Sequence, residues 1–304
     1  PYLISEFTMT ELQKVLKKNK RRKAVGPDEI PMEAFKDLDA ENRQSLLTLI
    51  NEWWQDETFP TELLEARVCL IFKNKGSTND LGNYRPISLL NSIYKIYAAL
   101  LQVRIAETLD PHVAPTQFGF RKKKVTAQAL QCVRRALEYW EITNNKNILL
   151  LLDWEKTFDK ITRPALFLAL ERMQLPPKYI NVIKSFYTDT MFNVELEGHT
   201  SVWHTQHTGI RQGCPLSPYL FILVMQVLFD DVHYHQYDLD PHGLLGPKNF
   251  RLGQPSNEVL YADDTILIAS DAKALTRLLN KIEVVSKDYG LSLNKGKCVV
   301  MQQN

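Results

Sequence analysis

The sequence predicts an α/β protein, and three patterns carry that prediction. Residues 148–152 form a continuous apolar run, which is typical of a buried central strand. Two shorter apolar runs, 259–260 and 266–269, flank Asp263 and Asp264 and predict a strand-turn-strand unit. In other segments, apolar residues recur every three or four positions, which is the period of helices that pack on one face.

The N-terminal third is expected to be mostly helical. Thr10 is the expected cap of the first helix, and apolar residues recur at helical spacing over 40–54. A strand over 67–72, a polar basic loop and a second strand near Arg85 predict a β-hairpin. The apolar stripe over 93–105 then predicts a long helix.

The remaining elements follow from turn and capping residues. Pro164 is expected in the first turn of a helix, because proline fits that turn. A hairpin is expected over 193–205, followed by a helix with Ser217 as cap and Pro218 as its first residue. After the Asp-Asp turn, a helix is expected to end at Gly290, and a strand follows it.

A carboxylate, Asp153, directly follows the apolar run 148–152. If that strand pairs with the later hairpin, Asp153 converges with Asp263 and Asp264. Adjacent carboxylates repel one another unless cations or protons neutralise them. A solvated Asp-rich turn would explain Asp263 and Asp264 taken alone. Three converging carboxylates instead fit a pair of Mg²⁺ ions, and such a pair supports nucleotidyl transfer.

Several sequence blocks, in a fixed order, resemble those of reverse transcriptases. Residues 151–160 (LLDWEKTFDK) resemble motif A, and residues 261–264 (YADD) resemble motif C. Residues 209–218 (GIRQGCPLSP) are similar to motif B of the non-LTR (LINE-type) retrotransposon enzymes. Further similar blocks lie in the N-terminal extension, the fingers and motif D, at residues 23–30, 83–88, 117–121 and 290–297.

The resemblance implies the fingers and palm of a right-hand polymerase fold, with a palm built as an antiparallel sheet packed on helices. It implies an N-terminal extension and fingers over 1–140 and a palm over 141–304, with 163–205 partly contributing to the fingers. Because the sequence stops at Asn304, shortly after motif D, we expect the thumb to be absent. The implied activity is RNA-templated DNA synthesis, with an RNA template, a DNA primer, deoxynucleoside triphosphates and two Mg²⁺ ions, for which Mn²⁺ can substitute.

The resemblance also assigns roles to individual residues. Phe158 matches the sugar gate that excludes a ribose 2′-hydroxyl, although an ordinary core phenylalanine is the alternative. Lys297 matches the motif D lysine that would protonate the leaving pyrophosphate, with Lys295 as its rival. The remaining roles are metal ligation and catalysis by Asp153, Asp263 and Asp264, triphosphate binding by Lys73 and Arg85, and lining of the nucleotide pocket by Gln212 and Gly213.

Charge is nearly balanced, so any nucleic-acid surface must be local. The 304 residues are 44% hydrophobic and carry a net charge of +2, enough for one large or two moderate cores. One basic cluster lies within 14–23, and a solvated face explains it equally well. A second, consisting of Arg121, Lys122, Lys123 and Lys124, follows the block at 117–120 where the resemblance implies template contact.

Cysteine spacing bears on metal binding and on the redox compartment, and the length of the apolar runs bears on membrane insertion. Cys69, Cys132, Cys214 and Cys298 lack metal-site spacing and predict free thiols in a reducing compartment. The resemblance implies an intracellular location, in a nuclear or cytoplasmic ribonucleoprotein. The run 220–225 is too short to span a bilayer, so no membrane partner is expected. Two alternatives stay open: a polymerase-like module that binds nucleic acid without catalysis, and an enzyme of the group II intron type. The oligomeric state is not predicted.

Overall fold

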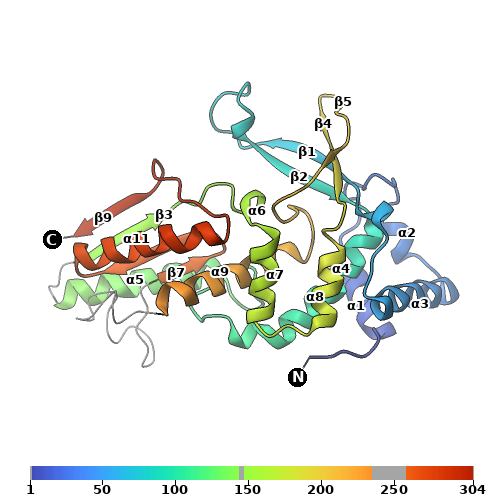
Figure 1. Ribbon diagram of the computed structural model, residues 1–304, viewed down its shortest axis with the longest axis horizontal. Coiled ribbons are helices and arrows are strands. Elements are labelled where there is room, and N and C mark those ends of the chain that lie inside the picture. The colour runs from blue at the N-terminus through green and yellow to red at the C-terminus, as the bar shows by residue number, and fades with distance from the viewer. Residues whose placement is uncertain (1, 144–146, 235–257, 304) are drawn as a thin grey trace. The chain divides into compact units, whose positions relative to one another are not determined.

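The computed structural model describes residues 2–143, 147–234 and 258–303 (Figure 1). These residues divide into two compact units, which are described separately below. Unit 1 consists of Pro1–Leu109 and Gln174–Ser217, and unit 2 consists of Asp110–Met173 and Pro218–Asn304.

The two units differ from the functional division expected near residue 140. Residues 110–140 belong to unit 2, although they were expected with the fingers. Residues 174–217 belong to unit 1, which agrees only in part with the expected contribution of 163–205 to the fingers. Compactness does not define function, so the assignment of fingers and palm stays a prediction.

Unit 1 contains five helices around a buried aromatic core. They are α1 (Met9–Lys18), α2 (Met32–Lys36), α3 (Ala40–Asp56), α4 (Ser92–Leu109) and α8 (Pro177–Ser185). Phe59 and Phe186 contact edge to face with ring centroids 5.3 Å apart, and Trp54 contacts Tyr179 in the same way at 4.9 Å. Each such ring pair contributes about 0.5–1.5 kcal/mol beyond the burial of its surface. The helices predicted over 40–54 and 93–105 are confirmed.

Helix α1 begins earlier than expected, so the prediction of Thr10 as its cap is wrong. The Thr8 hydroxyl accepts a hydrogen bond from the Glu11 N–H, and the Glu11 carboxylate accepts one from the Thr8 N–H. This reciprocal pair is a capping box, which satisfies two backbone donors that the helix itself leaves unpaired. Thr10 and Gln13 fit the same pattern in the sequence, but α1 already begins at Met9, so Thr10 lies inside its first turn and cannot cap it.

A mixed sheet completes unit 1, in the strand order β2-β1-β4-β5, with β6 also paired to β4. Its strands are β1 (Ala66–Phe72), β2 (Tyr84–Leu90), β4 (Met191–Leu196), β5 (His199–Thr200) and β6 (His204–Thr205). Strands β1 and β2 pair antiparallel, with Ala66 opposite Leu90, and β1 pairs with β4 in parallel. Both predicted hairpins are therefore confirmed. Short 3-10 turns lie at Thr61–Leu64 and Leu81–Asn83.

Unit 2 carries the sheet that matters for function. Its strands are β3 (Asn147–Leu152), β7 (Glu258–Tyr261), β8 (Asp264–Ala269) and β9 (Val299–Gln303), in the order β7-β8-β3-β9. Every neighbouring pair in this sheet is antiparallel. Strand β3 lies between β8 and β9; Leu149, Leu150 and Leu152 are buried and Leu151 is partly buried, as its apolar sequence predicts.

Unit 2 also contains helices. They are α5 (Thr126–Thr143), α6 (Thr157–Lys160), α7 (Arg163–Arg172), α9 (Ser217–His233) and α11 (Ala272–Asp288), with a 3-10 turn at Asp110–His112. Ala136 and Trp140 of α5 pack against Leu149 of β3 and Ile268 of β8 in one buried cluster. Helix α11 contacts β8 and lies over the sheet in Figure 1. No helix in the described ranges has the length and apolarity needed to cross a membrane.

Candidate functional site

The pairing of β3 with β8 sets Asp153 beside the hairpin turn. Leu152 pairs with Thr265, so Asp153 leaves the end of β3 next to Asp264. Tyr261 pairs with Asp264 across the turn, where Ala262 has a left-handed φ of 59°. Three carboxylates from two separate parts of the sequence therefore meet at one edge of the sheet. We call this group, Asp153, Asp263 and Asp264, the aspartate edge.

The carboxylates of the aspartate edge act on one another electrostatically. Partial burial, followed by the charges of Asp263 and Asp153, raises the pKa of Asp264 above its ordinary value. The Thr157 hydroxyl lies 3.5 Å from Asp263 Oδ2 and donates a hydrogen bond to it. The edge thus concentrates negative charge.

The kind of donor at the aspartate edge fits a hard divalent cation, because carboxylate oxygens are the ligands that Mg²⁺ and Mn²⁺ prefer. The three side chains are not arranged as a closed cage: among the described residues, no group of three or more His, Cys, Asp or Glu side chains is placed to hold one metal ion. Mutual repulsion keeps like charges apart in the metal-free protein. A cation would have to draw the carboxylates together.

Motif D runs alongside Asp153. The Asn294 N–H donates to the Asp153 carbonyl at 2.7 Å, and Trp154 forms a β-bridge with Leu293. Lys297 Nζ consequently lies 3.6 Å from Asp153 Oδ2. Its rival Lys295 is paired with Glu283 of α11 at 2.9 Å. The structure therefore favours Lys297 over Lys295 as the lysine of the site.

Phe158, on the short helix α6, is held by two other aromatic rings. It stacks on the buried ring of Phe221 at 4.9 Å between centroids and 14° between planes. Phe120 contacts it edge to face at 6.4 Å. The Phe158 ring is only half-buried, so one part of it stays accessible beside the aspartate edge. This arrangement suits a fixed steric gate, and it also suits ordinary packing.

Gln117 contacts the hairpin turn of the aspartate edge, although the resemblance of its sequence block implied contact with the template instead. The block at 117–121 resembles a template-contacting motif, but Gln117 is buried and binds the hairpin turn. Its Oε1 accepts hydrogen bonds from the N–H groups of Ala262 and Gly119, at 2.9 and 2.8 Å, and its Nε2 donates to the Ala262 carbonyl at 3.3 Å. A Cβ on Gly119 would lie 2.2 Å from the Ala262 nitrogen, so only glycine permits this approach.

Arg121 differs from its expected role as a phosphate contact. Its guanidinium is buried and donates to the Asp110 carboxylate at 2.9 Å and to the carbonyls of Ala114 and Gln117 at 2.7 and 3.0 Å. These bonds fix the segment that holds the turn and occupy the donors a phosphate would need. Lys122 and Lys123 are exposed, whereas the Lys124 ammonium lies 5.0 Å from the ring centre of Phe118.

The other predicted substrate residues, Lys73, Arg85, Gln212 and Gly213, belong to unit 1, and the aspartate edge belongs to unit 2. Lys73 Nζ donates to the Gly82 carbonyl at 2.9 Å. The exposed Arg85 guanidinium has no hydrogen-bond partner in the described part of the chain. The Gln212 carbonyl accepts from the Ser88 N–H at 2.7 Å. A Cβ on Gly213 would lie 2.3 Å from the Ser88 carbonyl oxygen, and Gly213 has a φ of 129°.

Comparison with known proteins identifies the family. Residues 72–304 match the family described as reverse transcriptase (RNA-dependent DNA polymerase). The chain is 27% identical over 308 residues to the RNA-directed DNA polymerase from mobile element jockey of Drosophila melanogaster, covering 97% of this chain and 31% of that protein. It is 26% identical over 283 residues to the retrovirus-related Pol polyprotein from type-1 retrotransposable element R2 of Nasonia vitripennis, covering 91% and 25%. The chain thus spans about a third or less of these relatives.

A solved structure shows the same fold. The apo telomerase from Candida tropicalis, truncated from its C-terminal domain, matches with a TM-score of 0.57 at 14% identity, covering 85% of this chain and 56% of that one. The fold is the right-hand polymerase fold, and reverse transcriptases use divalent metal ions, as the carboxylates of the aspartate edge suggest. Relatives named as polymerases do not favour the binding-only alternative. By sequence and fold, this chain belongs to the reverse transcriptase family, with relatives among the non-LTR retrotransposon enzymes.

Proposed function

We propose that the chain is the polymerase part of a non-LTR retrotransposon protein and extends a DNA primer on an RNA template with deoxynucleoside triphosphates. The observation that carries this proposal is the aspartate edge. An antiparallel pair of strands brings Asp153 from one block and Asp263 and Asp264 from another to the same point. A protein that only bound nucleic acid would have no need of three mutually repelling carboxylates there.

Asp153 and Asp263 would be the main ligands of two Mg²⁺ ions, with Mn²⁺ as a substitute and Asp264 as a weaker ligand. Bound metal would supply activation of the attacking hydroxyl and neutralisation of charge on the transferred phosphoryl group. Lys297 has a role of its own. Its ammonium group, 3.6 Å from Asp153 Oδ2, can compensate that carboxylate and donate a proton to the leaving pyrophosphate.

Nucleotide selection rests on Phe158 and on residues of unit 1. The Phe158 ring, fixed by Phe221, would leave no room for a ribose 2′-hydroxyl. Lys73 and Arg85 would contact the triphosphate, for which positive charge is the natural partner. Gln212 and Gly213 would line the nucleotide pocket, where the missing side chain of Gly213 lets the backbone approach closely.

Primer extension tests this function directly. An RNA template annealed to a DNA primer is incubated with the protein, Mg²⁺ and deoxynucleotides, and the products are separated by length. We expect extension that stops when the metal is chelated and that falls strongly when ribonucleotides replace deoxynucleotides. Binding of the same duplex without any extension, across Mg²⁺ and Mn²⁺ concentrations, would instead support the binding-only alternative.

A further inference from the structure

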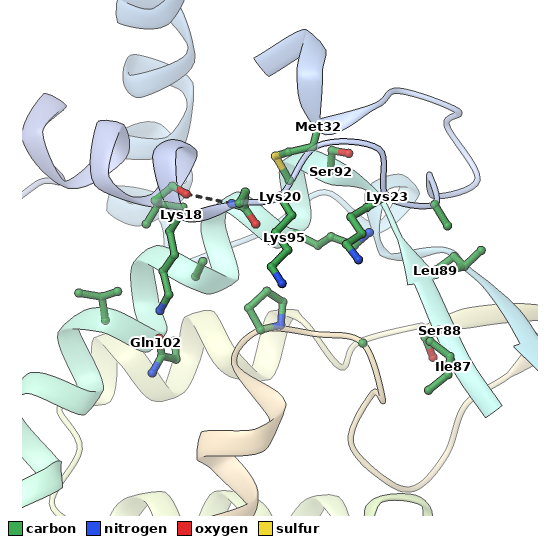
Figure 2. A pocket seen from close by; sticks show the side chains of 17 residues that line it. Lys18, Lys20, Lys23, Met32, Ile87, Ser88, Leu89, Ser92, Lys95 and Gln102 are labelled. Carbon is green, nitrogen blue, oxygen red and sulfur yellow. Dashed lines mark hydrogen bonds between the residues drawn. The ribbon is translucent and has the colours of Figure 1, made fainter. Parts of the chain in front are cut away.

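Unit 1 contains a cavity of about 490 Å³, and of the residues that line it only Gly213 has a role assigned above. Its walls come from α1, the segment after α1, α4, β2 and the loop that carries Gly213 and Pro215. Figure 2 shows four lysine side chains extending toward this hollow from α1, the following segment and α4. We call it the lysine pocket, after Lys18, Lys20, Lys23 and Lys95.

The four ammonium groups have no counter-charge in the wall. No aspartate or glutamate lines the pocket, and within the described residues these ammonium groups take part in no hydrogen bond or ion pair. Lys95 is half-buried, and burial lowers its pKa although the charge of Asp28, which is not part of the lining, acts in the opposite direction. Four like charges around one concavity repel each other and favour an anion between them.

Basic residues close by in the same unit behave differently. Arg21 forms a two-pronged ion pair with Asp37. Lys36 Nζ donates to the carbonyls of Leu16 and Asn19 at 2.7 and 2.5 Å. Carboxylates and carbonyl oxygens that can pair with a cation therefore lie within reach of this part of the chain. The four lysines of the pocket form no such contact within the described residues.

The lining also indicates the kind of anion. No aromatic side chain, histidine or arginine lines the pocket, so there is no surface on which a base could stack, as single-stranded nucleic acid requires. The volume lies in the range of small-molecule sites. Ser88, Ser92 and Gln102 add neutral hydrogen-bonding groups to the four cations. These features suit several phosphate groups held close together.

We propose that the lysine pocket is a binding site for a compact polyphosphate anion, distinct from the aspartate edge and sharing only Gly213 with the residues proposed to bind nucleotide. The ligand neutralises the four lysines. It also bridges three parts of the wall, which are the segment that follows α1, helix α4 and the Gly213 loop, because all three line the same cavity. Binding to the folded state alone also stabilises unit 1, by an amount that grows with the logarithm of the ligand concentration. The proposal goes beyond polymerase activity and does not depend on it.

Calorimetric titration of the metal-free protein with inorganic tripolyphosphate, repeated with inositol hexakisphosphate, tests this proposal. Lys20→Gln and Lys95→Gln each remove one pocket charge. Lys17→Gln is the matched control, since Lys17 is exposed on α1 and does not line the pocket. Arg85→Gln reports on the alternative site, because Arg85 is proposed to bind nucleotide triphosphates. Melting temperatures of all variants verify that each is folded.

We expect each pocket variant to raise the dissociation constant roughly three- to tenfold and Lys17→Gln to change it less than about twofold. Equal effects in Lys17→Gln and the pocket variants would overturn the proposal in favour of general charge attraction. A loss confined to Arg85→Gln would assign the anion to the nucleotide site. Short single-stranded RNA that displaces tripolyphosphate and binds more tightly, with the same dependence on Lys20 and Lys95, would assign the pocket to a nucleic-acid strand and overturn it too.

Discussion

Asp264 shows how the fold alters the chemistry of a single residue. In the unfolded chain its carboxyl has an ordinary pKa, whereas burial and the charges of Asp263 and Asp153 raise that pKa in the folded protein. Because the folded value lies above the unfolded one, the aspartate edge destabilises the metal-free protein once the pH exceeds both values. This penalty disappears as the pH falls below them and the carboxyls become protonated.

Removing one charge from the edge should therefore stabilise the metal-free protein. We expect Asp263→Asn to raise the melting temperature at pH 7 by about 1–3 °C, because repulsion on Asp264 is relieved. The difference should vanish at a pH at which the carboxyls of both proteins are protonated. Thermal unfolding followed by circular dichroism across this pH range measures it. A lower melting temperature for the variant at pH 7 would contradict the inferred repulsion.

Phe158 separates a role in specificity from a role in packing. We expect Phe158→Val to raise the ratio of ribonucleotide to deoxynucleotide incorporation about 10- to 200-fold by removing a steric clash. The lost stacking on Phe221 should lower the unfolding free energy by about 1–2 kcal/mol. Single-nucleotide incorporation assays give the ratio, and Phe120→Val is the matched control. An unchanged ratio in a folded Phe158→Val protein would leave the ring a packing role only.

At the scale of elements, polar side chains from distant segments hold the functional parts in place. Gln117 binds a turn 145 residues later through both ends of its amide. Arg104 of α4 is buried, pairs with Glu11 at 2.7 Å and donates to the carbonyls of Ser5 and Glu6. Removing the Glu11 carboxylate would leave the buried Arg104 charge without its ion pair, at a cost of about 3–5 kcal/mol, so this pair holds the N-terminal segment strongly to α4.

Gln117 should act as a positioning residue for the aspartate edge. Gln117→Met leaves the N–H groups of Ala262 and Gly119 without their acceptor, at a cost of about 1–3 kcal/mol for each buried group. We expect a lower kcat with little change in the KM for deoxynucleotide, because the turn that carries the carboxylates loosens. Gln128→Met is the control, since Gln128 is exposed and its amide oxygen also accepts from a backbone N–H, that of Val125. Equal kinetics for Gln117→Met and the control would refute this role.

The segment after Gln117 should contribute charge to nucleic-acid binding through Lys122 and Lys123 rather than Arg121. Each lost phosphate contact reduces the slope of log affinity against log salt by about 0.7–0.9. We expect Lys122→Ala and Lys123→Ala each to show this change in a salt titration with a primer-template duplex. Lys287→Ala, on the exposed face of α11, should not. Identical slopes in all proteins would mean that the two lysines only face solvent.

Local sequence patterns predicted most helices and strands. Features that depend on contacts between distant residues could not be predicted in the same way. The apolar run of β3 and the Asp-Asp hairpin were readable because strand burial and turn residues are local properties. Their pairing was a conditional expectation, which the register of Leu152 with Thr265 satisfies. The burial of Arg121 was not readable, because a basic residue beside three lysines looks solvated until Asp110 and two carbonyls enclose it. The capping-box pattern of Thr8 with Glu11 is local, so the sequence alone contains it.

At the scale of the whole molecule, the account rests on one claim: Asp153 and Asp263, 110 residues apart in sequence, form a single catalytic unit. The predicted nucleotide contacts lie in unit 1, and the aspartate edge lies in unit 2. If the two aspartates bind the same metal ions, replacing either one should abolish the catalysis that both support. Effects of residues that act as a unit do not add.

Single-turnover incorporation of one deoxynucleotide on an RNA template, with Mg²⁺, tests this claim most directly. We expect Asp153→Asn and Asp263→Asn each to lower the rate by at least about a thousandfold, comparable to the loss of other essential catalytic groups. The double variant should be no slower than either single variant within a few fold. A near-normal rate in either single variant, or losses that multiply in the double variant, would contradict the existence of a shared catalytic unit.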